Sequence, residues 1–223
     1  MVDTPTSLSY LSYLNCACNS VYYQEDGRLL VGSDGHLQVY DSADHIVSKT
    51  HSNIGNIFAA IQHNSFIYIL HKKSEKNGCK VDMLSPDAST YFSLFEFTNN
   101  NQYFWPTLAV SDKYVAAVCP QAFPNEPDKL YLYDICTTQL IISDVVGSGI
   151  SFMANGDLLL ADWTSVTRFR INNGDLSVVW VCDDVTDVNG ICVADDGLIY
   201  ASTDDACVLY VISPDGMYSS IQR

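Results

Sequence analysis

The residues best suited to bind a charged ligand are five carboxylates near the C-terminus. They lie in two short segments on either side of one predicted strand-turn-strand unit. Clustered carboxylate oxygens are preferred ligands of hard divalent cations, and they also attract basic segments of a partner. Neither segment has the Asp-x-Asp-x-Asp-Gly order of a calcium loop, so the sequence favours a solvated acidic surface over a metal site. The five residues are Asp183, Asp184, Asp187, Asp204 and Asp205.

Two aromatic segments and one basic segment are the other candidates for binding. Phe123 lies in the proline-rich segment PQAFPNEPDK, and Tyr103 and Trp105 lie in TNNNQYFWPT. Aromatic side chains commonly anchor protein interfaces, and prolines stiffen a loop, which lowers the entropy lost on docking. Lys72 and Lys73 begin the basic segment HKKSEKNGC. Together these residues predict a surface that binds a protein or a peptide.

No spacing in the sequence is typical of a catalytic or metal-binding motif. The five histidines lie in the first third of the chain and include no His-x-x-x-His pair. Cys16 and Cys18 are too close for a zinc knuckle or a thioredoxin-like site. The segment 147–149, Gly-Ser-Gly, is not the Gly-x-Ser-x-Gly of a nucleophile elbow. We therefore expect no catalytic residues and no cofactor.

Charge and composition narrow the class of partner and the compartment. The 223-residue chain has a formal net charge of −15, whereas a nucleic-acid or anionic-membrane binder needs a cationic face. No apolar stretch is long enough for a transmembrane helix. The eight cysteines include several within apolar runs, and no Asn-x-Ser/Thr sequon occurs. These features predict a cytoplasmic protein that binds neither nucleic acid nor membrane.

The candidate segments are positioned by an internal repeat of about 40 residues, the length of a four-stranded propeller blade. Three of its first turns are Asp-Gly or Asn-Gly, which predict two-residue hairpins with both residues at positive φ. Third strands such as HLQVYD and KLYLYD alternate with a period of two. The first turn of each unit falls at Gly27, Ser65, Lys113, Gly156 and Gly197.

The repeat predicts an all-β fold, a β-propeller of about five four-stranded blades. A β-sandwich of hairpin pairs is the alternative, but sandwiches rarely repeat their sequence at a fixed period. The ring is either a small closed propeller or a fragment of a six-bladed one, and residues 1–17 could supply a closing strand. Residues 18–223 form the propeller domain, with approximate blades at 18–52, 53–98, 99–146, 147–184 and 185–223.

With four strands A to D in each blade, the D-to-A crossovers and the B–C loops emerge on one face, and the A–B and C–D turns on the other. The acidic, aromatic and basic segments are all crossovers or B–C loops in the repeat. We therefore expect one loop face to carry the binding surface, because binding residues concentrate on loops held by a rigid scaffold.

The fifth unit, NGICVADDGLIYASTDDACVLYVISPDG, resembles an NHL repeat. The units GISFMANGDLLLADWTSVTRFRINNGD and QEDGRLLVGSDGHLQVYDSAD resemble it more loosely. The resemblance implies a propeller that acts as an interaction module or scaffold. Members often carry RING segments, whose cysteine and histidine pattern is missing from this sequence. The function expected is therefore that of a non-enzymatic protein- or peptide-binding propeller.

The sequence around Asn189 is also similar to the gluconolactonase/regucalcin family, through Asn-Gly followed by ICVADDGLIYAS. That resemblance implies a six-bladed hydrolase with one divalent cation, and Asn189 matches its metal-binding asparagine. Where the family has an acidic ligand, the segment CACNSVYYQEDG has Cys18 and Asn19. A metal-dependent lactonase is therefore the alternative function, and a degenerate fragment without independent function is the third.

Overall fold

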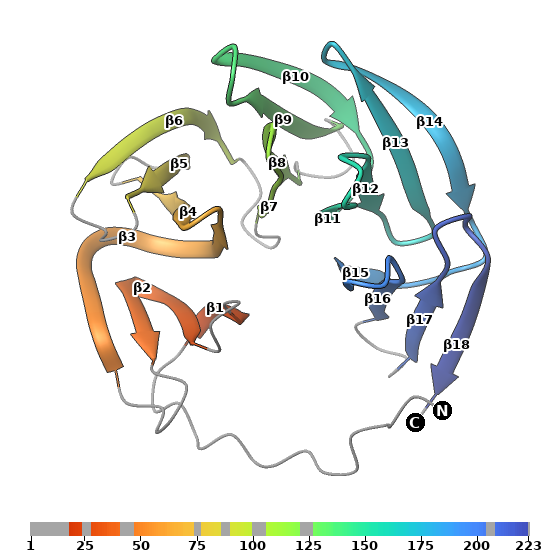
Figure 1. The fold of residues 1–223 in the computed structure, drawn as a ribbon, viewed down its shortest axis with the longest axis horizontal. Coiled ribbons are helices and arrows are strands. Elements are labelled where there is room, and N and C mark those ends of the chain that lie inside the picture. The colour runs from red at the N-terminus through yellow and green to blue at the C-terminus, as the bar shows by residue number, and fades with distance from the viewer. Residues whose placement is uncertain are drawn as a thin grey trace.

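The fold is a β-propeller of five antiparallel four-stranded blades (Figure 1). This computed structural model describes residues 18–23, 28–40, 47–73, 77–85, 90–99, 106–120, 127–203 and 208–222. Within these ranges every regular element is a β-strand, and no helix is present that could span a bilayer. The all-β propeller expected from the repeat is confirmed.

The third, fourth and fifth blades each consist of four consecutive strands hydrogen-bonded in chain order. The first strand of each of these blades, β7, β11 or β15, lies nearest the centre of the ring, and the last strand, β10, β14 or β18, lies at its rim (Figure 1). The twelve strands are β7 Thr107–Val110, β8 Tyr114–Cys119, β9 Asp128–Asp134, β10 Gln139–Val145, β11 Gly149–Phe152, β12 Leu158–Ala161, β13 Val166–Asn172, β14 Asp175–Cys182, β15 Val188–Val193, β16 Ile199–Thr203, β17 Val208–Ile212 and β18 Tyr218–Gln222.

The first two blades are joined by a continuous strand. Residues 47–56 of β3 pair with β2 in the first blade, and residues 57–63 pair with β4 in the second. Likewise, residues 29–33 of β2 pair with β1, and residues 34–40 pair with β3. The six strands are β1 Cys18–Tyr23, β2 Leu29–Tyr40, β3 Val47–His63, β4 Phe66–Lys72, β5 Gly78–Leu84 and β6 Tyr91–Thr98.

The core lies between the blades, which explains the unbroken apolar runs in the second strands. Successive side chains of a strand point to opposite faces of its sheet, and here both faces are covered. On β4, Ile69 packs with Ile57 towards the first blade, whereas Leu70 packs with Val115 towards the third. All six residues of β8 are buried for the same reason. The apolar run of a B strand thus stabilises two interfaces at once.

Neighbouring blades also contact one another through their inner strands, β3 with β7, β7 with β11, and β11 with β15. Among the described residues, β15 makes no comparable contact with β1. The segment 1–17, expected to supply a closing strand, lies outside the described residues.

The Asn-Gly and Asp-Gly turns differ from their expected geometry. Only the glycine has positive φ, +84° at both Gly156 and Gly197, so the prediction of two positive-φ residues at these turns is wrong. The side chain before each glycine explains the difference. Asn155 Oδ1 accepts a hydrogen bond from the Asp157 N–H at 3.1 Å, and Asp196 Oδ1 accepts one from the Leu198 N–H. The Asp-Gly turn at 26–27 lies outside the described residues.

Two-residue hairpins with both residues at positive φ occur elsewhere. Asn64 and Ser65 have φ of 48° and 68°, and they connect β3 to β4. Asn173 and Gly174 have φ of 51° and 94°, and they connect β13 to β14. Asparagine is among the residues that tolerate this conformation best, so the Asn64–Ser65 turn, which has no glycine, adopts the geometry expected of the Asp-Gly and Asn-Gly turns.

Candidate functional site

One described part of the predicted loop face is the junction between the fourth and fifth blades. Asp187 lies in the crossover from β14 to β15, and Trp163 lies in the turn from β12 to β13. The Asp187 N–H donates a hydrogen bond to the Trp163 carbonyl oxygen at 2.6 Å. A D-to-A crossover and a B–C turn therefore meet on one face, and this junction joins Trp163 to the predicted acidic segment.

The crossover displays its carboxylates because its apolar residues are anchored in the core. Val185 and Val188 are buried between the two blades. Asp183, Asp184 and Asp187 are exposed, and within the described part of the chain no Lys or Arg forms an ion pair with them. The Trp163 side chain is 49% exposed. We call Trp163, Asp183, Asp184 and Asp187 the acidic surface.

The turn that carries Trp163 is held rigidly by the preceding residue. Asp162 Oδ1 accepts hydrogen bonds from the N–H groups of Thr164 at 2.6 Å and Ser165 at 2.7 Å. Its Oδ2 accepts a further bond from the Ser165 hydroxyl at 2.9 Å. Sequence reasoning missed Trp163, although Asp-Trp-Thr-Ser is the signal of such an Asp-capped turn, which places the tryptophan at the tip.

Lys72 and Lys73, the two predicted basic residues, are not part of this junction. Lys72 is the last residue of β4 in the second blade and Lys73 follows it; the Lys73 ammonium forms an ion pair with Glu96 at 2.7 Å. The structure therefore does not bring the basic segment next to the acidic surface. The remaining candidates, Tyr103, Trp105, Phe123, Asp204 and Asp205, lie outside the described residues.

Asn189, the residue implied by the lactonase resemblance, is exposed on β15. In the ranges that the structure describes, no three His, Cys, Asp or Glu side chains are grouped so that they could hold a metal ion.

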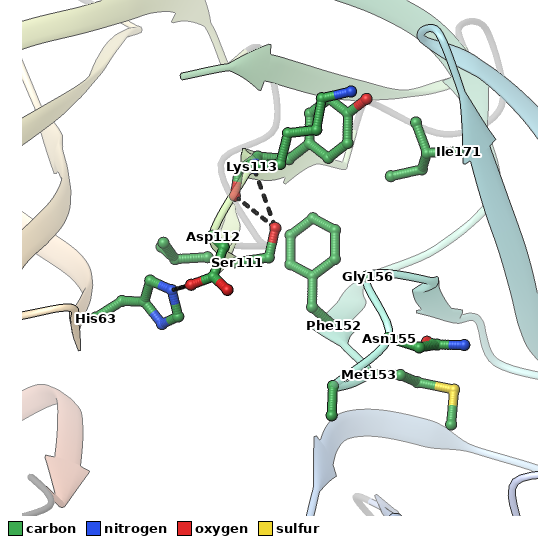
Figure 2. Close-up of a pocket in the computed structure, with 12 residues that line it drawn as sticks. His63, Ser111, Asp112, Lys113, Phe152, Met153, Asn155, Gly156 and Ile171 are labelled. Carbon is green, nitrogen blue, oxygen red and sulfur yellow. Dashed lines mark hydrogen bonds and ion pairs between the residues drawn. The ribbon is translucent and has the colours of Figure 1, made fainter. Parts of the chain in front are cut away.

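A cavity of about 520 Å³ opens on the opposite face, among the A–B turns (Figure 2). The turns of the third and fourth blades line it, together with His63 at the end of β3. His63 Nε2 lies 2.9 Å from Asp112 Oδ1, which also accepts a hydrogen bond from Asn64 Nδ2 at 2.9 Å. Hydrogen bonds from Asn64 and His63 hold the pKa of Asp112 below its usual range, so the carboxylate is charged at neutral pH.

The walls of this cavity combine apolar and polar groups. Val110, Phe152, Met153 and Ile171 supply the apolar part, and Asn155 supplies an amide. Sequence reasoning did not find this site. The signal was the equivalence of the first turns in successive units, which places Asn64, Asp112 and Asn155 in neighbouring blades.

The sequence matches no family model and no curated protein. Solved propellers match by structure. Kluyveromyces lactis Hsv2 is 12% identical over 92% of this chain and 64% of its own, with a TM-score of 0.64. A streptogramin B lyase is 14% identical over 95% of this chain and 70% of its own, with a TM-score of 0.67. The virginiamycin B lyase of Staphylococcus aureus is 9% identical over 91% and 69%, with a TM-score of 0.62. The chain thus spans just under two thirds of the length of Hsv2, and it shares the β-propeller fold with these proteins.

Proposed function

We propose that this chain is a non-enzymatic, NHL-like interaction module that binds a basic segment of a partner protein or peptide. The observation that carries the proposal is the exposed Trp163 beside Asp183, Asp184 and Asp187 on a rigid junction of two blades. The indole face attracts Lys or Arg by a cation–π interaction, and the carboxylates pair with the same cations. The indole and the carboxylates can therefore contact the same basic side chain.

The charge of the whole chain supports the same partner. A net charge of −15 steers basic partners towards the protein and repels nucleic acids and acidic proteins. The proposed surface extends to Phe123, Tyr103 and Trp105, whose segments are a B–C loop and a crossover in the sequence repeat. Lys72 and Lys73 would then contact an acidic part of the partner, separate from its basic segment.

The first prediction is that Trp163→Ala weakens binding of a basic peptide by about tenfold or more, because aromatic anchors contribute most of an interface's free energy. The probe is a fluorescein-labelled Lys/Arg-rich peptide, measured by fluorescence anisotropy, with a Glu-rich peptide of the same length as the negative probe. Asp183→Asn combined with Asp187→Asn should weaken binding as well, and added salt should reduce the effect.

Met217→Ala is the matched control, because Met217 is 74% exposed in the turn between β17 and β18, on the other face. It should leave peptide binding unchanged. A pull-down from cell extract with the same variants tests natural partners. The proposal is wrong if Met217→Ala loses partners that Trp163→Ala keeps, with both variants folded.

A second prediction concerns the enzymatic alternative. We expect no lactone hydrolysis with added calcium, zinc or manganese, because Cys18 and Asn19 stand where the lactonase resemblance requires an acid. Turnover of a γ-lactone is measured by pH-stat with each cation. Cation-dependent turnover that Asn189→Ala abolishes would establish the lactonase function instead.

A further inference from the structure

The cavity among the A–B turns lies on the face opposite the acidic surface, so the proposed function leaves it unused. Its volume of about 520 Å³ falls within the range of small-molecule sites. We infer that this cavity binds a small organic cation, an ammonium group carried on an aromatic or aliphatic body. Three features of its lining lead to this class of ligand.

The first feature is a charged carboxylate with one oxygen available. Asp112 Oδ1 is occupied by His63 and Asn64. Since an ionised carboxylate only accepts hydrogen bonds, Nε2 of His63 must carry the proton in this pair. Among the described residues no hydrogen bond reaches Oδ2, and the Asp112 side chain is 86% exposed. The His63 and Asn64 bonds therefore orient the carboxylate, and Oδ2 remains free to accept an ammonium N–H.

The second feature is the apolar wall beside this carboxylate. The Phe152 ring projects into the cavity between the Ser111–Asp112 turn and the Met153–Gly156 turn (Figure 2). Val110 and Ile171 add aliphatic surface. An aromatic ring next to a carboxylate suits a cation with an apolar body, because the ring contributes both apolar contact and a cation–π attraction.

The third feature is the orientation of Lys113, the lysine that lines the cavity. Lys113 Nζ lies 3.7 Å from Asp134 Oδ2 and 4.9 Å from the centroid of the Tyr114 ring. Figure 2 shows the Lys113 side chain running away from Asp112. Asp134 therefore compensates the Lys113 charge, and Asp112 is the charge presented to a ligand. An anionic ligand would lack a facing cation here.

Three probes of one shape test the inference: benzylammonium, benzyl alcohol and benzoate. Binding is followed by NMR, through chemical shifts of the Met153 methyl group. We expect benzylammonium to bind most tightly. Asp112→Asn should weaken it about threefold, as expected for one solvent-exposed charge pair, and leave benzyl alcohol unchanged. Phe152→Leu should weaken both benzylammonium and benzyl alcohol.

Two controls separate charge at the cavity from charge in general. Asp175→Asn removes another exposed carboxylate, at the start of β14, and should leave all three probes unaffected. Lys113→Gln should preserve benzylammonium binding. The inference is overturned if benzoate binds best and Lys113→Gln abolishes its binding, or if the folded Asp112→Asn variant binds benzylammonium as the wild type does.

Discussion

Replacing Asp157 with alanine is expected to lower the free energy of unfolding by about 3–5 kcal/mol, the usual cost of removing one partner from a buried ion pair. The Asp157 side chain is 5% exposed and the Arg168 side chain 12% exposed. Arg168 donates to Asp157 Oδ2 from Nε at 2.8 Å and from Nη2 at 2.6 Å. Without Asp157 the guanidinium stays buried and uncompensated.

The effect extends beyond one blade because Arg168 also joins two blades. Its Nη1 donates to the Pro214 carbonyl oxygen at 2.7 Å, and Trp180 Nε1 donates to the same oxygen at 2.9 Å. Pro214 lies in the turn between β17 and β18 of the fifth blade. Loss of Asp157 therefore loosens the contact between the fourth and fifth blades, on which the acidic surface depends.

Urea unfolding followed by circular dichroism measures this loss. Asp144→Ala is the control, because the Asp144–Lys129 ion pair lies at the surface and should contribute only about 0–1 kcal/mol. If both variants lose the same free energy of unfolding, Asp157 does not compensate a buried charge on Arg168.

The contribution of Asp157 should also depend on pH. Burial by itself raises the pKa of this carboxyl, but hydrogen bonds from Arg170, Arg168 and Asn155 outweigh it and hold the pKa below the usual value. A lowered folded-state pKa stabilises the protein at neutral pH, and this stabilisation is lost as the pH falls through that pKa. The difference between wild type and Asp157→Ala should therefore shrink below about pH 4.

Gly55→Ala is expected to cost about 3 kcal/mol, from backbone strain and from a clash that requires the backbone to shift. Gly55 has φ of +72° where β3 passes from the first blade to the second. A Cβ there would overlap the Lys72 carbonyl oxygen and approach His71 Nδ1 to 3.4 Å. His71 is buried and bonded to Asp82 at 2.9 Å, so it has little room to move.

Gly35→Ala is the matched control for this substitution. Gly35 has φ of +78°, and a Cβ there would meet no atom within 4 Å. It should cost only about 1 kcal/mol, the strain of the left-handed conformation alone. Thermal unfolding of both variants separates the two contributions. If Gly55→Ala costs no more than Gly35→Ala, close packing at the bend of β3 is not what requires the glycine.

The sequence by itself predicted a propeller of about five blades and most of their strands, because these depend on local patterns. The second strands, FIYIL, YVAAV and LLLA, are apolar throughout since both faces of each blade are covered. The exposure of Asp183, Asp184 and Asp187 also follows from local pattern, because the intervening valines occupy the core. Turn geometry was predicted less well, since side-chain oxygens such as Asn155 Oδ1 compete for backbone N–H groups.

Only the tertiary structure decided which residues lie together across blades. The Trp163 carbonyl oxygen accepts a hydrogen bond from the Asp187 N–H, which joins it to the acidic segment, and His63 meets Asp112 across 49 residues of sequence. Asp157 and Arg168 compensate each other within one sheet, whereas Arg168 reaches Pro214 in the next blade. The physical reason is that side-chain contacts between blades depend on the distance and rotation between neighbouring blades. The alternation of apolar residues along a strand specifies only which face of that strand is buried.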